Sequence, residues 1–302
     1  MTRVVVSCAI LTMMVSLRTP SATGQEVVLG VLEDNHGSYA GEPNFRSVRV
    51  VFQKSGTDWK SFPSDCRDQN CLKTVAANYP GEMKWTITFD GRNLGQITSR
   101  TPSEFKWYAA IGQQEIAATD SVPTIGKRSP EFGGYTEDVV YRPLVANSQP
   151  YFKDPEEWKQ FRPSQDLASI LRQAFRKQFP KLCRLGGPEH SRMDAFPYRD
   201  QEVGLVKAYA SKLGWSIARL HLQAVDCADV EAGFDIDDPW FAVSPDGSAI
   251  HLADGMWLVD AADYDNDGKS ELLFSIDRDD RGGYELFYDS FKKHVTFEFS
   301  YH

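Results

Sequence analysis

Residues 263 to 271 combine residue types and spacing that suit the binding of a metal ion. The stretch reads Asp-Tyr-Asp-Asn-Asp-Gly-Lys-Ser-Glu, so acids stand at its positions 1, 3, 5 and 9 and a glycine at position 6. Hard cations such as Ca²⁺ take about six to eight oxygen ligands, and alternating side chains on a tight turn can supply several of them. The glycine permits the sharp turn. The expected ligands are Asp263, Asp265, Asp267, the backbone carbonyl of Lys269, and Glu271.

The residues around this stretch exclude a helix–loop–helix calcium site. An EF-hand loop needs a bidentate acid at its position 12 and a helix on either side. Position 12 is Phe274, and the flanking runs 256–259 and 272–276 are short and apolar, as strands are. The sequence therefore predicts a short acidic loop between two strands.

This loop and the apolar strand after it resemble the calcium loop of FG-GAP and VCBS repeats, which reads D-x-D-x-D-G-x-x-[DE]. The likeness covers residues 256 to 302, about one blade of an integrin-type β-propeller, and the loop occurs once in the chain. The resemblance implies a bound Ca²⁺ and a role in binding a protein or glycan. The alternative is an acidic turn with solvated carboxylates, but three acids this close would repel one another without a cation.

Other catalytic motifs are missing from the sequence. The histidines form no spaced metal pair, and there is no Gly-x-Ser-x-Gly elbow, phosphate loop or dinucleotide fingerprint. Acids are the remaining catalytic candidates, because glycoside hydrolases use two carboxylates about 5–10 Å apart. We expect a non-enzymatic binding module, with a glycosidase-like hydrolase as the alternative. A loose acidic stretch precedes Trp240 and comprises Asp226, Asp229, Glu231, Asp235, Asp237 and Asp238.

The N-terminus has the pattern of a secretory signal peptide. Arg3 precedes the apolar run 4–16, which is short for a membrane span, and small residues at 22–24 offer a cleavage site before Gln25. Residues 1–24 are therefore predicted to be removed, and the protein to be secreted or periplasmic. No later apolar run is long enough to cross a bilayer, so no transmembrane segment is expected in the mature chain.

The net charge of the chain argues against some classes of binding partner. The chain has a formal net charge of −9. Nucleic acids and anionic membrane surfaces both require a basic face, so neither is expected as a partner. An acidic chain is compatible with divalent cations.

The cysteines predict two disulfides. Cys8 leaves with the signal peptide, and an even number remains in an oxidising compartment. Three pairings are possible, and closeness in sequence favours Cys66–Cys71 and Cys183–Cys227. Zinc is disfavoured because no second cysteine pair lies near the first.

Turn residues and alternating apolar residues predict a mainly β chain. Turns are expected at 54–58, 90–91, 212–214 and 245–247. The fold class is a propeller-like or multi-sheet antiparallel β architecture, with one amphipathic helix near 164–182. The C-terminal segment has four strand-like runs at 256–260, 272–276, 283–288 and 295–301.

The predicted organisation after the signal peptide has two parts. Residues 25–150 form a hairpin-rich N-terminal region, and residues 151–302 contain the helix followed by the C-terminal β region. Residues 120–150 are rich in turn formers and mark the seam. A single domain spanning 25–302 is the alternative.

Overall fold

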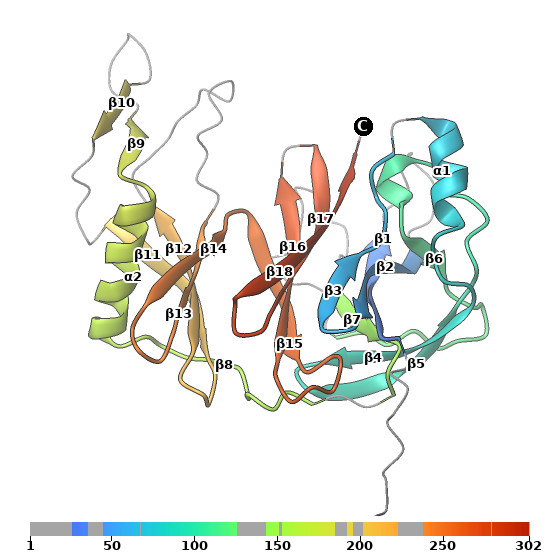
Figure 1. The fold of residues 1–302 in the computed structure, drawn as a ribbon, viewed down its shortest axis with the longest axis horizontal. Helices are drawn as coiled ribbons and strands as arrows, with labels where there is room; N and C mark the ends of the chain where they lie inside the picture. The colour runs from blue at the N-terminus through green and yellow to red at the C-terminus, as the bar shows by residue number, and fades with distance from the viewer. Residues whose placement is uncertain are drawn as a thin grey trace, which may run out of the picture.

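A computed structural model of the chain describes residues 26–35, 45–66, 68–125, 143–150, 153–184, 192–195, 202–222, 238–278 and 280–301. These residues are mainly β, as predicted. Their strands form three larger antiparallel sheets and one two-stranded pair, and two α-helices accompany them. Figure 1 shows the three larger sheets side by side, with the sheet of the last four strands in the middle.

The first part of the chain builds the N-terminal sheet, with strand order β3-β2-β1-β7-β4-β5 and with β6 paired to β2. Its hairpins turn where the sequence predicts. Asp90 and Gly91 connect β4 to β5 with φ of 52° and 65°, and a type I′ hairpin turn requires positive φ at both of these positions. The strands are β1 (Val28–Asn35), β2 (Phe45–Ser55), β3 (Asp58–Ser61), β4 (Met83–Phe89), β5 (Arg92–Ser99), β6 (Gln113–Glu115) and β7 (Leu144–Asn147).

The last part of the chain builds the C-terminal sheet, an antiparallel meander in the order β15-β16-β17-β18. This confirms the four predicted strand runs. The acidic loop connects the first two strands. The strands are β15 (Met256–Ala262), β16 (Glu271–Arg278), β17 (Arg281–Tyr288) and β18 (Lys293–Ser300).

A third sheet, the helix-backed sheet, has the order β14-β13-β12-β11-β8. The predicted amphipathic helix is confirmed as α2 (Gln165–Gln178), which begins after the N-cap Ser164 and ends before Pro180. Its buried Leu171 and Phe175 pack against this sheet. The strands are β8 (Lys159–Gln160), β11 (Val203–Ala210), β12 (Ser216–Leu222), β13 (Trp240–Val243) and β14 (Ala249–Ala253), and the separate pair is β9 (Lys181–Arg184) with β10 (Arg192–Ala195).

The prediction of a single helix was wrong, because the structure has a second helix, α1 (Gln69–Ala76). Asp68 caps it by accepting a hydrogen bond from the backbone N–H of Cys71 (2.9 Å). Its buried Leu72, Val75 and Ala76 fall at helical spacing, but a pattern of only about two turns is too short to distinguish a helix from other structures. A short 3₁₀-helix, η1 (Tyr108–Ala110), follows further along the chain.

The C-terminal sheet is buried on both faces. Leu273 belongs to the apolar core shared with the N-terminal sheet. Its neighbours Leu272 and Phe274 point the other way, into a core shared with Trp240 of the helix-backed sheet. This explains why the apolar residues 272–274 follow one another without alternation in β16, since a strand covered on both faces has no polar side there. The cores therefore join residues on both sides of the predicted seam, and the two-part division stays a prediction.

Candidate metal centre

The acidic loop turns sharply between β15 and β16. Asn266 and Gly268 adopt φ of 61° and 91°, in the left-handed region that glycine and asparagine tolerate best. The loop begins at an isolated bridge, where the N–H of Asp263 donates to the carbonyl of Lys153 (2.7 Å). The residues that alternate with or follow the acids thus have the backbone geometry that a tight turn requires.

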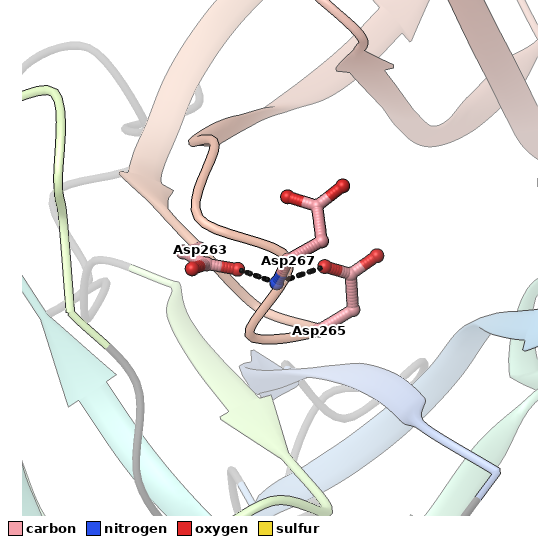
Figure 2. Close-up of side chains that lie close together, drawn as sticks. All are labelled: Asp263, Asp265 and Asp267. Carbon is pink, nitrogen blue, oxygen red and sulfur yellow. Dashed lines mark hydrogen bonds between the residues drawn. The ribbon is translucent and has the colours of Figure 1, made fainter. Parts of the chain in front are cut away.

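Three of the predicted ligands come together at this turn. One carboxylate oxygen from each of Asp263, Asp265 and Asp267 lies within 4.8 Å of the other two, an arrangement that could hold a metal ion. Figure 2 shows the carboxylates of Asp263 and Asp265 on either side of the backbone nitrogen of Asp267, whose own side chain extends away from that nitrogen. That nitrogen donates to Oδ1 of Asp263 (2.9 Å) and to Oδ1 of Asp265 (3.1 Å). Below, these three residues are called the aspartate cluster.

Burial decreases along the aspartate cluster, from the buried Asp263 to the exposed Asp267. Burial raises the pKa of Asp263 to about 6. The N–H groups of Gly268 and Asp267 oppose this rise, and the charges of Asp265 and Asp267 add to it. The charges of Asp265 and Asp267 therefore disfavour the ionisation of Asp263, and a cation between the carboxylates would reverse that effect.

The other two predicted ligands lie outside the group of three. Glu271 is buried at the start of β16, where its Oε2 accepts a hydrogen bond from the N–H of Tyr264 (2.8 Å). Burial, followed by the charge of Asp265, raises the pKa of Glu271 well above its ordinary value. The ammonium of Lys269 points to Asp289 (2.7 Å). Ligation by Glu271 and by the carbonyl of Lys269 stays a prediction.

Residues far away in the sequence hold the loop in place, and the sequence analysis missed them. Asn147 of β7 donates from Nδ2 to the carbonyl of Tyr264 (2.9 Å). The hydroxyl of Ser270 donates to Oδ1 of Asp154 (2.6 Å). The loop is thus attached to the N-terminal sheet and to the segment that leads into β8. No local pattern signals such contacts, because the partners are more than a hundred residues apart.

A lysine was also missed. The ammonium of Lys54, near the end of β2, forms an ion pair with Oδ2 of Asp265. Among the described residues, Lys54 is the only base that forms an ion pair with the aspartate cluster. The cluster therefore lies at the contact between the N-terminal and C-terminal sheets.

One predicted disulfide is confirmed, and the other falls outside the described residues. Cys66 and Cys71 are joined, with their Cα atoms 5.5 Å apart, as disulfide geometry requires. The bond closes the turn that leads into α1. Cys227 and the side chain of Cys183 lie outside the described residues.

The acidic stretch proposed for a hydrolase lies mostly outside the described residues. Its last member, Asp238, is described, and its carboxylate contacts His221 (2.7 Å) and Arg219 (3.3 Å). Both of these partners lie on β12 of the helix-backed sheet. Asp238 thus pairs with basic side chains of β12, and the other five members of the stretch lie outside the described residues.

Within the described parts of the chain, no helix has both the length and the apolar character needed to cross a membrane. Comparisons of the chain with protein-family models, with curated proteins and with solved structures find no match.

Proposed function

We propose that this chain is an exported, calcium-binding β protein that works as a non-enzymatic binding module and whose ion is structural. The observation that carries the proposal is the convergence of the Asp263, Asp265 and Asp267 carboxylates within 4.8 Å. The ligand atoms that these three residues offer are carboxylate oxygens, which hard cations prefer.

Calcium suits the cluster better than magnesium does. Ca²⁺ accepts about six to eight ligands in irregular geometry, whereas Mg²⁺ demands a near-ideal octahedron and keeps several of its waters. The aspartate cluster is asymmetric, with Asp263 buried and Asp267 exposed. Protein oxygens can therefore bind one side of the ion while water completes the other.

A structural role follows from the position of the loop. It contacts β7 through Asn147 and the segment before β8 through Asp154. An ion that holds the loop in this conformation would also hold these contacts between distant parts of the chain. We expect the ion to stabilise the packing of the sheets, with the partner bound elsewhere on the surface.

The C-terminal sheet supports the resemblance to an FG-GAP or VCBS blade, which remains part of the proposal. It is a four-stranded antiparallel meander, and its acidic loop follows the first strand. By analogy with such blades, the protein would bind a protein or glycan at or outside the cell envelope. This step from fold to function is an analogy, because one fold can host many activities.

Thermal unfolding in excess EDTA and in millimolar Ca²⁺, with the disulfides intact, tests the ion. A ligand that binds only the folded state stabilises it by about 2.7 kcal/mol at a hundredfold excess over its dissociation constant. We therefore expect a clear rise in Tm with Ca²⁺ and a smaller rise with Mg²⁺. An unchanged Tm would contradict the proposal.

Two neighbouring variants assign the response to the cluster. Asp267→Asn removes one charge and should abolish most of the calcium response. Asp289→Asn removes a nearby, partly exposed acid that pairs with Lys269, and it should leave the response intact. Equal behaviour of the two variants would show that calcium acts through general surface charge.

A further inference from the structure

A positive charge already lies against the aspartate cluster, and a distant strand supplies it. Lys54 belongs to β2, and its ammonium pairs with Oδ2 of Asp265 while both side chains are largely buried, at 15% and 4% exposure. The ammonium also lies 5.4 Å from the ring of Trp59 and 5.7 Å from the ring of Tyr288. The structure thus encloses it between a carboxylate and two aromatic rings.

Lys54 and a metal ion would share the same carboxylate. Oδ1 of Asp265 already accepts a hydrogen bond from the N–H of Asp267, and Oδ2 contacts the ammonium. An ion held by the three aspartates would lie a few ångströms from that ammonium. Two cations at such a distance repel each other strongly in a partly buried site. The free energy of ion binding must therefore include the cost of weakening the lysine contact.

We propose that Lys54 is a tethered competitor of Ca²⁺: its ammonium neutralises Asp265 when no ion is bound, and the ion displaces it. This inference rests on the calcium site proposed above. It predicts a lower calcium affinity than the three aspartates alone would give. It also predicts that the contact between Lys54 and Asp265, which joins β2 to the C-terminal sheet, forms only when no ion is bound.

The side chain of Lys54 is able to make this exchange. Its ammonium sits on a flexible stem of four carbons. Lys54 is followed by Ser55, the last residue of β2, and then by the turn at Gly56. The ammonium can therefore move outward while the stem keeps its apolar contacts. The rings of Trp59 and Tyr288 remain available for cation–π contact after the carboxylate is released.

The experiment is a calcium titration of the mature protein by calorimetry, comparing the wild type with Lys54→Met. Methionine keeps the unbranched apolar stem and removes the charge. We expect Lys54→Met to bind Ca²⁺ about tenfold more tightly, a difference that corresponds to about 1.4 kcal/mol. In EDTA the same variant should have a lower Tm than the wild type, because Asp265 then lacks its counter-charge.

Lys293→Met is the matched control. Lys293 lies 5.9 Å from the same Tyr288 ring, but it pairs with Asp58 (2.6 Å) and not with the aspartate cluster. Its removal should leave calcium affinity unchanged. If Lys54→Met bound Ca²⁺ as the wild type does, or more weakly, Lys54 would be orienting Asp265 and the inference would be overturned. A wild type that binds no Ca²⁺ would instead refute the proposed site itself.

A second measurement uses the wild type, so it does not depend on the folding of a variant. An amine-acylating reagent followed by peptide mapping reports how accessible each lysine is. Displacement by Ca²⁺ should raise the acylation rate of Lys54 severalfold and leave that of Lys293 unchanged. If calcium binds and the rate at Lys54 does not rise, the ammonium has stayed on Asp265 and the exchange does not occur.

Discussion

Two polar clusters join the N-terminal sheet to the C-terminal sheet, and their charges are balanced in different ways. In the first, Glu33 of β1 accepts hydrogen bonds from Arg49 of β2 (2.7 Å) and from the hydroxyl of Tyr284 of β17 (2.7 Å). The guanidinium of Arg49 also donates to the carbonyls of Ala109 and Ile111. We call this group the arginine cluster. Each of its charges has a partner within the chain.

The aspartate cluster is different, because acids outnumber bases. Among the described residues, its three carboxylates share one ion-pair partner, Lys54. Its other contacts are backbone N–H groups, which carry only partial charge. The arginine cluster is thus balanced within the chain, whereas the aspartate cluster carries an excess of negative charge, and its three carboxylates could hold a metal ion. Calcium should therefore affect one cluster and not the other.

The largest expected effect comes from breaking the arginine cluster. Arg49→Met removes its only guanidinium and leaves Glu33, whose side chain is 11% exposed, without a counter-charge. Removing one partner of a buried ion pair costs about 3–5 kcal/mol. Urea unfolding should show this loss equally in EDTA and in Ca²⁺. If Ca²⁺ restored the free energy of unfolding of Arg49→Met, the two clusters would not be independent of each other.

A smaller change tests the same cluster. Tyr284→Phe removes one hydroxyl and leaves the contact between Arg49 and Glu33 in place. Loss of a hydrogen bond to a charged group costs about 1.5–3 kcal/mol. The loss in unfolding free energy should again be the same with and without Ca²⁺. An effect larger than that of Arg49→Met would show that the phenol, rather than the guanidinium, stabilises Glu33.

The smallest expected effect is on the pH dependence of the aspartate cluster. The pKa of Asp263 is raised from 3.8 to about 6, so the folded state binds its proton more tightly than the unfolded state does. In EDTA this contribution to stability is present below pH 3.8 and is lost as pH rises through 6. A bound ion favours the charged form of Asp263 and so opposes this loss of stability as pH rises.

Calorimetry at two pH values checks this effect. At pH 6 about half of the Asp263 carboxyls are protonated, so calcium affinity should fall about twofold relative to pH 7.5, or about 0.4 kcal/mol. Asp267→Asn serves as the control, since it should bind little Ca²⁺ at either pH. An affinity that rose on acidification would contradict the assignment of Asp263 as a ligand.

The parts of the structure that local patterns encode could be predicted from the sequence. The Asp-Gly turn at 90–91 and the spacing of Asp263, Asp265 and Asp267 each depend on residues a few positions apart. The stripe along α2 is likewise local. The arginine cluster could not be predicted, because Glu33 and Tyr284 are 251 residues apart. Lys54 was missed for the same reason. Only the folded sheets bring these residues together.

Burial on both faces makes the C-terminal sheet the middle layer of the molecule (Figure 1), although residues 256–300 follow the strands of both outer sheets in the chain. The strands of the two outer sheets therefore leave the ribosome before the strands of the sheet that separates them. Until β15 to β18 emerge, Trp240 and the other apolar residues that will contact them lack those contacts. Exposed apolar surface and unpaired strand edges promote aggregation during folding. The insertion of β15 to β18 between the outer sheets therefore covers apolar surface that would otherwise favour aggregation.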